Sequence, residues 1–586
     1  MTRPATGLPD EAPDEAWGQG RNGRVSEDAR ASEDGRMSED ARASDLAQRL
    51  WEGLLQMAPE LGTAVGDERF DDRLSDPGPE GRAREEAAFR GALDELRTID
   101  RDALDEGNRL TMDVVEAIAN RFVAAIENRT DRLVVASHMM GPSNMLGEIA
   151  SMQRADTPER LARYEARLRA FPAYAEAWAE VAREAVATGV IAPRVVVERS
   201  IGQTERILAI APEDSPAMMP LGDDGDARER IAAAVKDAVL PAHRTLLEAL
   251  RDTYLPAATE TIGLSELPDG DALYATEILA WTSLPLDARE VHELGRERFE
   301  AIQRERYEIA ARLGHDDPNT AIAERNASGE NVAASPEALV KIAEEQVARS
   351  WDVAPRFFGL LPTDNCEVRR VEEFREADMP FAFYNPPTED RSRPGVYYIN
   401  CFDLEHRPLH HVAAVTYHEA NPGHHFQIAL EQELPGRSSI RRFAGSLAGA
   451  AFVEGWGLYS ERLADEMGLY LDDWERLGML EAQAHRAARL ITDTGIHAMR
   501  WEREAAIAKL EEAGNPRIDA EIEVDRYIAL PGQALSYMIG MIEIEDARAA
   551  MEARDGAAFS LRDFHDRVLS LGQLPLPAFR RELGSA

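Results

Sequence analysis

The chain contains 586 residues, carries a formal net charge of −41 and is 44% hydrophobic. It is long enough and apolar enough to bury a large core. Its acidity argues against nucleic acids and anionic membrane surfaces as partners, because both would repel a negative protein surface. Aromatic residues make up only 6% of the chain. Alanine, leucine, glutamate and arginine dominate instead, which favours helices.

The first 44 residues form a repetitive acidic segment. The triplet Ser-Glu-Asp recurs at Ser26, Ser32 and Ser38, and arginines follow the same six-residue period. Large apolar residues are nearly absent, so no buried core can offset the entropy lost on ordering. We predict a disordered tail over residues 1–44 that acts as a spacer, with a regulatory tail as the alternative.

Helical patterns fill most of the remaining chain. Leu46, Leu50, Leu54 and Leu55 would share one face of a helix. Two helices are predicted within residues 84–130, and others over residues 157–171, 174–188, 226–252, 288–313, 336–350, 440–467, 474–513, 517–528 and 533–553, with a loop-rich stretch at 315–335. Thr157 and Asp287 are expected to cap two of these helices. The predicted fold is one mainly α-helical domain over residues 45–586, with two lobes around a central cleft as a variant.

Two short strands interrupt this pattern. Residues 381–384 and 395–399 are rich in aromatic and β-branched side chains, and a proline-containing loop joins them. We therefore expect a small β-sheet directly before a histidine-rich helix. A peptide substrate could add itself to an exposed edge of this sheet. The alternative is a structural hairpin that covers the helix.

The two cysteines, Cys366 and Cys401, do not suggest a disulfide framework. Cys401 precedes the histidines closely enough to be considered as a metal ligand, but a small buried residue at the end of a strand is the favoured interpretation. No N-terminal apolar stretch resembles a signal peptide, and no run is long enough to span a membrane. These features favour a cytoplasmic location.

Histidines are concentrated in one short segment. Six of the 13 lie between His406 and His425, and the pair His418-Glu419 follows an apolar run that predicts a buried helix. Imidazole is a common zinc ligand, and an adjacent glutamate is the usual general base for a metal-activated water. The segment therefore predicts a metal site.

The spacing of these histidines differs from the familiar H-E-x-x-H motif, in which the two imidazoles lie one helical turn apart. The position four residues after His418 is Pro422, and the next histidines are His424 and His425. Proline lacks the N–H that would continue the helix, and Gly423 relaxes the backbone. A bulge or wide turn at residues 420–423 would bring His424 under His418, as in H-E-x-x-H with two residues inserted.

Three motifs together carry a family resemblance. They are Tyr-His-Glu-Ala-Asn-Pro-Gly-His-His-Phe-Gln at 417–427, Phe-Val-Glu-Gly-Trp-Gly-Leu-Tyr at 452–459 and Pro-Gly-Gln-Ala-Leu-Ser-Tyr-Met-Ile-Gly at 531–540. With them the chain resembles the DUF885 family from about residue 45 onward. That family looks like a distant branch of the helical zinc metallopeptidases, of the thimet oligopeptidase and Taq carboxypeptidase type. The resemblance implies a helical metallopeptidase-like body with the small sheet beside the active-site helix.

The third metal ligand should come from another helix. Glu454 is a lone carboxylate in an apolar, glycine-containing helix, where burial is costly unless the group is paired or bound to a metal. A buried salt bridge, for example to Arg486, is the alternative, and the family resemblance favours the ligand role. His425 competes with His424 as second ligand. The Gly-His pair at 423–424 resembles the Gly-His of the related metallopeptidases, and this resemblance favours His424. Glu461 could orient a ligand from outside the metal shell.

Catalytic roles follow from this ligand set and from the resemblance. Glu419 would be the general base. In the related peptidases a tyrosine and a histidine from the C-terminal region donate to the oxyanion, which implies Tyr537 first and His497 second. Asp493 lies one turn before His497 and could orient it.

Several other polar residues near the motifs are interpreted as structural. His410 and His411 are expected at the start of the helix or on the surface, and His485, Arg489 and Arg500 could be surface residues.

These features predict an enzyme, a hydrolase that uses one zinc ion to cleave peptide bonds of short peptides. Two alternatives remain open, a metal-dependent amidase or isopeptidase acting on a non-protein metabolite, and a helical binding protein without activity. No G-x-S-x-G elbow, phosphate-binding G-x-x-x-x-G-K-[ST] loop or paired E-x-x-H set near the histidines supports another enzyme class. The expected partner is a small peptide or peptide-like substrate, with no nucleic acid and no membrane.

Overall fold

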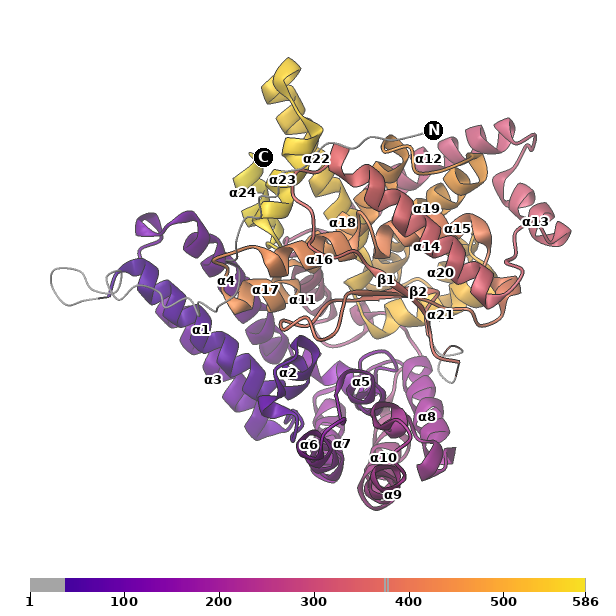
Figure 1. The fold of residues 1–586 in the computed structure, drawn as a ribbon. Coiled ribbons are helices and arrows are strands. Elements are labelled where there is room, and N and C mark those ends of the chain that lie inside the picture. Colours follow the sequence, from indigo (N-terminus) through magenta and orange to yellow (C-terminus); the bar gives the residue numbers. More distant parts are fainter. Residues whose placement is uncertain (1–36, 374–375, 377–378, 585–586) are drawn as a thin grey trace, which may run out of the picture.

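The computed structural model describes residues 37–373, 376 and 379–584. Helices dominate it, and a single three-stranded sheet lies among them in the described part (Figure 1). The prediction of a mainly α-helical fold is therefore confirmed.

The first helix starts earlier than predicted. Helix α1 (Glu39–Met57) is capped by Ser38, whose hydroxyl accepts a hydrogen bond from the Ala41 N–H at 3.2 Å. Ala43 is fully buried, so the boundary of the predicted tail at residue 44 is wrong, because residues 39–44 already belong to the helix. Residues 1–36 lie outside the described residues. The leucine stripe is confirmed, and all four of its side chains are buried.

The N-terminal half continues with helices only. These are α2 (Pro59–Val65), α3 (Pro79–Leu96), α4 (Glu106–Asn128), α5 (Met145–Met152), α6 (Pro158–Arg169), α7 (Phe171–Thr188), α8 (Arg194–Ala209), α9 (Gly225–Ala234) and α10 (Leu240–Glu248). Helix α6 begins as predicted, with Thr157 accepting from the Arg160 N–H at 3.2 Å. Helices α5–α10 gather at the bottom of Figure 1, and all of them except α8 contribute to a core cluster of their own.

Four more helices lead to the sheet, namely α11 (Gly270–Thr282), α12 (Ala288–Arg312), α13 (Pro318–Ser328) and α14 (Pro336–Val353). Asp287 caps α12 as predicted. Helix α13 lies in the stretch predicted to be loop-rich. Its start signal was present in the sequence, because the Asp317 carboxylate accepts from the Thr320 N–H at 2.7 Å and Pro318 occupies the first turn.

The sheet has one strand more than predicted. Strands β2 (Ala382–Asn385) and β3 (Val396–Ile399) pair antiparallel, and β1 (Glu367–Arg370) pairs parallel to the other side of β3. The order β1-β3-β2 makes β3 the central strand and leaves β2 at an edge. The sheet shares a core cluster with α14 and the helix that carries the histidines, so the expected position of the sheet beside that helix is confirmed.

The C-terminal half consists of α15 (Leu409–Glu419), α16 (His424–Glu433), α17 (Ser439–Ala444), α18 (Ser446–Glu466), α19 (Asp473–Met499), α20 (Arg503–Glu512), α21 (Arg517–Ala529), α22 (Ser536–Asp555), α23 (Leu561–Leu571) and α24 (Leu576–Leu583). The single helix predicted over 474–513 is two helices, because Arg500 takes a left-handed conformation with φ of 58° and ends α19.

Helices α18 and α22 approach each other very closely. A Cβ atom at Gly540 would lie 1.7 Å from the Ala451 carbonyl oxygen, and one at Gly455 would lie 2.2 Å from the Gly540 carbonyl carbon. Only glycine permits this contact. It brings the first turn of α22, with Tyr537, beside the part of α18 that carries Glu454.

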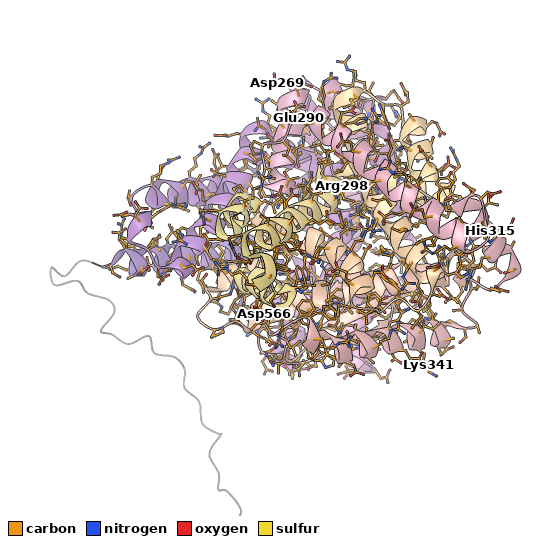
Figure 2. The ribbon with its side chains drawn as sticks, turned by 90° about the horizontal axis from the view of Figure 1, so that it is seen from above. Asp269, Glu290, Arg298, His315, Lys341 and Asp566 are labelled. Carbon is orange, nitrogen blue, oxygen red and sulfur yellow. The ribbon has the colours of Figure 1, made fainter. Side chains whose placement is uncertain are left out.

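Side-chain contacts on the outside tie distant segments together. Figure 2 labels Arg298 on α12, which pairs with Glu545 of α22 at 2.9 Å. It also labels Asp566 on α23, whose carboxylate accepts from the backbone N–H groups of Gly359 and Leu360 at 2.7 and 2.9 Å. The chain leading into the sheet is thus fixed to the C-terminal helices.

Candidate metal centre

The predicted break between the histidines is present. Helix α15 ends at Glu419 and α16 begins at His424. At Gly423 a Cβ atom would lie 1.9 Å from the His418 carbonyl oxygen, so the turn needs glycine at this position. The Pro422 carbonyl accepts from the indole N–H of Trp456 at 2.8 Å, which anchors the turn to α18.

This turn brings the two imidazoles together. The rings of His418 and His424 lie 4.6 Å apart between centroids, with their planes at 84°. His418, Glu419 and His424 each place one possible ligand atom within 4.8 Å of the others. Because the helix is broken, two histidines six residues apart come together as two histidines four residues apart do on a continuous helix.

Glu454 of α18 faces both histidines. Its Oε2 atom lies 3.7 Å from His418 Nε2 and 3.5 Å from His424 Nε2. Burial opposes ionisation of this carboxyl, but the two imidazoles hold its pKa well below the usual range. The alternative partner, Arg486, instead donates to the Ala482 carbonyl at 3.4 Å, and no ion pair joins it to Glu454 among the described residues.

Glu461 contacts the other side of the His418 ring. His418 Nδ1–H donates to Glu461 Oε1 at 2.8 Å, and Gln483 Nε2 donates to Glu461 Oε2 at 3.1 Å. Burial opposes protonation of His418, but the carboxylates of Glu454 and Glu461 raise its pKa to about 10. A proton and a metal cation would therefore compete for Nε2.

The donor atoms fit a divalent transition metal. The hydrogen bond from Nδ1–H to a carboxylate fixes the tautomer that leaves Nε2 of His418 available as a ligand. His424 Nδ1 is buried without a hydrogen-bond partner in the described part of the chain, while its Nε2 faces Glu454. Two imidazoles and one carboxylate form a donor set typical of catalytic zinc.

Glu419 is the last residue of α15. It is half-buried, and no side chain of the described residues hydrogen-bonds to its carboxylate. The group is therefore free to accept a proton next to His418.

Tyr537 reaches the same region from α22. Its ring centroid lies 6.4 Å from that of His418, with the two planes 25° apart. The phenol oxygen accepts from Arg526 Nη2 at 3.2 Å, and the guanidinium carbon of Arg489 lies 4.4 Å from the ring centroid. The predicted oxyanion donor is thus beside the histidine pair.

His497 lies in a different environment. The Leu264 N–H donates to its Nδ1 at 3.3 Å, and its Nε2–H donates to the Tyr527 carbonyl at 3.0 Å. Burial lowers its pKa to about 4. Both ring nitrogens are therefore engaged by the backbone, and the structure does not bring His497 to the histidine pair.

The expectation that Asp493 orients His497 is wrong. The Asp493 carboxylate accepts from the Tyr274 hydroxyl at 2.5 Å and from the Gly532 N–H at 3.1 Å. It positions the glycine turn before α22 instead. Burial raises its pKa to about 7.

His425 points away from its neighbour. Its Nε2–H donates to the Asp364 carbonyl at 3.0 Å, so its Nδ1 accepts from the Tyr384 hydroxyl at 2.9 Å. Burial lowers its pKa to about 4. The structure thus brings His424, not His425, to His418.

The sequence did not indicate a second cluster at the start of α15. His410 Nε2 and His411 Nε2 each lie 3.0 Å from Glu481 Oε2. His410 is at the helix start, as expected, but it is buried, so a surface position is wrong for it. Glu481 lies on α19, and only the tertiary fold shows that it faces these histidines.

Three further expectations concern single residues. Cys401 is buried in the core cluster of the sheet, and burial raises its pKa to about 11, which disfavours a ligand thiolate. His485 and Arg489 are buried rather than on the surface. Arg500 is exposed as expected and pairs with Glu266 at 2.9 Å.

Comparison with known proteins places the chain in a family. The family model described as "Bacterial protein of unknown function (DUF885)" matches residues 59–583. The chain belongs to the DUF885 family. No curated protein matches. The resemblance to DUF885 read from the three motifs is therefore confirmed, whereas the link to metallopeptidases is not part of this finding.

Two solved structures share the fold. A lipoprotein candidate from Colwellia psychrerythraea has a TM-score of 0.88 and 25% identity, over 93% of this chain and 99% of that one. A lipoprotein candidate of unknown function from Shewanella oneidensis has a TM-score of 0.71 and 20% identity, over 92% and 99% of the two chains. In the DUF885 chain studied here, no helix among the described residues has the length and apolarity needed to cross a bilayer.

Proposed function

We propose that this DUF885 protein is a zinc-dependent hydrolase that cleaves peptide bonds of short peptides. The observation that carries the proposal is the convergence of His418 Nε2, His424 Nε2 and Glu454 Oε2, with the Glu419 carboxylate unengaged beside them. A bound zinc ion would supply the acidification of a water molecule and the polarisation of the substrate carbonyl.

The residues around this centre have distinct roles in the proposal. His418, His424 and Glu454 hold the ion. Glu461 fixes the orientation of His418 through the 2.8 Å hydrogen bond to Nδ1. Glu419 accepts a proton from the attacking water and delivers it to the departing amine. Tyr537 donates its phenol proton as a hydrogen bond to the oxyanion that develops on the carbonyl.

Two alternative functions compete with this proposal. One differs in the bond that is cleaved, and the other involves no reaction. An amidase or isopeptidase acting on a non-protein metabolite would use the same residues, and a library of fluorogenic peptides tested beside simple amides separates the two. A binding protein without activity would not need Glu419 unengaged next to a complete ligand set.

The location of the protein forms a separate part of the proposal. Two free, buried cysteines are compatible with the reducing cytoplasm, whereas both structural neighbours are described as lipoprotein candidates. Fractionation of cells into cytoplasm and envelope decides between these locations. Peptides reach either compartment, so the proposed chemistry does not depend on the result.

The test is the variant Glu419→Gln. The amide keeps the shape of the side chain and cannot accept a proton, so we expect zinc to remain bound while kcat falls by about 10² to 10⁴-fold. Zinc content and turnover of a cleaved peptide are measured on the same preparation. Unchanged hydrolysis by this variant would contradict the proposed mechanism.

A further inference from the structure

Three arginines surround the candidate oxyanion donor. The guanidinium carbons of Arg489 and Arg486 lie 4.4 and 6.0 Å from the centroid of the Tyr537 ring. Arg526 donates to the Tyr537 hydroxyl at 3.2 Å. Arg486 and Arg489 come from α19 and Arg526 from α21, so two helices direct positive charge at one phenol.

Among the described residues, a single carboxylate accepts hydrogen bonds from this arginine cluster (Arg486, Arg489, Arg526). Glu523 accepts from Arg489 Nη2 at 2.8 Å and from Arg526 Nη1 at 3.4 Å. His485 Nε2 lies 3.6 Å from the same carboxylate, but burial lowers the pKa of His485 to about 4, so this imidazole is neutral. The cluster therefore has more positive than negative charge.

Arg486 is the arginine left without a carboxylate. Among the described residues no ion pair involves it, its Nη1 donates only to the Ala482 carbonyl at 3.4 Å, and its Nε is buried without a partner. Arg489 is different, because it is buried and anchored to Glu523.

Removal of a guanidinium from water is costly unless an anion compensates it. Arg486 is half-buried, and the side chains of Arg526 and Glu454 are 22% and 24% exposed. Arg486, Arg526 and Glu454 therefore all keep part of their side-chain surface in contact with solvent. Tyr537 contacts both the arginines and a proposed metal ligand, since its ring also lies 6.4 Å from that of His418.

We infer that the arginine cluster binds a carboxylate of the substrate close to the bond that is cleaved, with Arg486 as the main determinant of specificity. This inference rests on the proposed hydrolase function and narrows it. The substrate is a peptide or acyl amino acid with a free carboxylate, and cleavage occurs near that terminus. Guanidinium suits this role because its planar fork pairs with both oxygens of a carboxylate.

A binding experiment tests the inference without any need for turnover. Calorimetry on the zinc-loaded chain compares N-acetyl derivatives of alanine, leucine, phenylalanine and glutamate with the corresponding α-carboxamides. We expect at least one free acid to bind about 10 to 10²-fold more tightly than its amide, which is the usual effect of one charge-assisted hydrogen-bonded pair. Equal affinity for every acid and its amide, or no binding of any acid, overturns the inference.

Matched variants assign the effect to Arg486. Arg486→Gln should reduce the preference for the acid to less than about threefold, and Arg486→Lys should retain an intermediate preference because it keeps the charge without the fork. The control is Arg476→Gln, on the same helix about 15 Å earlier, where the arginine pairs with Asp465. A full preference in Arg486→Gln overturns the assignment.

Turnover separates this inference from the proposed function. If the protein hydrolyses acylated peptides with free and amidated C-termini equally well, the hydrolase stands and the inference fails. If it binds free acids selectively but cleaves no peptide or amide, the carboxylate site stands and the proposed function fails.

Discussion

Helix α15 carries a histidine cluster at each end, and the two have the same composition but different chemistry. At its C-terminal end, His418 and His424 face Glu454, and at its N-terminal end, His410 and His411 face Glu481. Each set contains two imidazoles and one carboxylate. The difference lies in what contacts the second nitrogen of each ring.

In the N-terminal cluster the position of the His410 ring proton is already assigned. His410 Nδ1 accepts from Asn331 Nδ2 at 2.8 Å, and the Asn331 amide is held in this orientation because its Oδ1 accepts from the His410 N–H at 3.1 Å. The proton of His410 therefore sits on Nε2 and is donated to Glu481. A ring nitrogen that donates its N–H to a carboxylate has no free lone pair, so it cannot also bind a cation beside that carboxylate.

In the C-terminal cluster the assignment is reversed. Glu461 takes the Nδ1 proton of His418, which leaves Nε2 directed at Glu454. Residue types in proximity therefore do not distinguish the two clusters, whereas the outer partner that fixes the tautomer does.

The largest expected effect concerns metal content. Wild-type protein should contain about one zinc per chain, and alanine at His418, His424 or Glu454 should each lower zinc affinity by more than about 10²-fold. Alanine at His410, His411 or His425 should leave zinc bound. Metal analysis and competition with a chelator give these values, and zinc loss in His410→Ala with retention in His418→Ala would reverse the comparison.

The second prediction separates the oxyanion donor from a structural histidine. Tyr537→Phe should reduce kcat by about 10² to 10³-fold with little change in KM or zinc content, because one donor is lost only as charge develops. His497→Ala should keep kcat in the folded protein but lose about 1–3 kcal/mol of stability, since two backbone groups lose their partner. A mild Tyr537→Phe together with an inactive, folded His497→Ala would assign the role to the histidine.

The third prediction concerns the two outer carboxylates. Glu461→Gln should weaken zinc binding by about 10 to 10²-fold, because the hydrogen bond that orients His418 loses its charge. Glu481→Gln should leave zinc affinity unchanged and cost about 1–3 kcal/mol of stability. Zinc titration and urea unfolding measure the zinc affinity and the stability of both variants. Equal zinc affinities in the two variants would contradict the prediction.

The smallest expected effect is a dependence of stability on pH. Burial lowers the pKa of His410 to about 4, against an ordinary value of 6.5. The unfolded chain therefore binds this proton between these values and the folded chain does not, so the contribution is fully present above pH 6.5 and is lost as pH falls to 4. Unfolding of His410→Gln near pH 5 should take up about one proton fewer than wild type.

Much of the centre could be predicted because its signals are local. Pro422 and Gly423 mark the end of one helix and the start of the next, so the break at 420–423 followed from backbone chemistry. The choice of His424 over His425 came from the family resemblance of the Gly-His pair. Glu454 was recognisable as a carboxylate in an apolar helix. The helix caps at Thr157 and Asp287 are equally local and were also predicted.

The features that could not be predicted from the sequence depend on contacts between distant segments. The partners of His497 are the backbone of residues 264 and 527, and Glu481 meets His410 only through the packing of α19 on α15. Strand β1 was missed because Glu367–Arg370 is charged and short, and it is ordered by pairing with β3. No local pattern reports such neighbours.

The hydrogen bond from Trp456 to the Pro422 carbonyl joins two parts of the same short stretch of sequence. This proximity in sequence affects how the candidate centre is inherited. The turn, both imidazoles, the proposed third ligand and the outer carboxylate all lie between His418 and Glu461, so one uninterrupted stretch of sequence encodes the whole proposed ligand set. Tyr537 and the arginine cluster are encoded separately, on α19, α21 and α22. Under the proposed function, a relative that kept the first stretch and lost the second would still hold the metal ligands and the general base Glu419, but it would lack the oxyanion donor and the arginines that select the substrate.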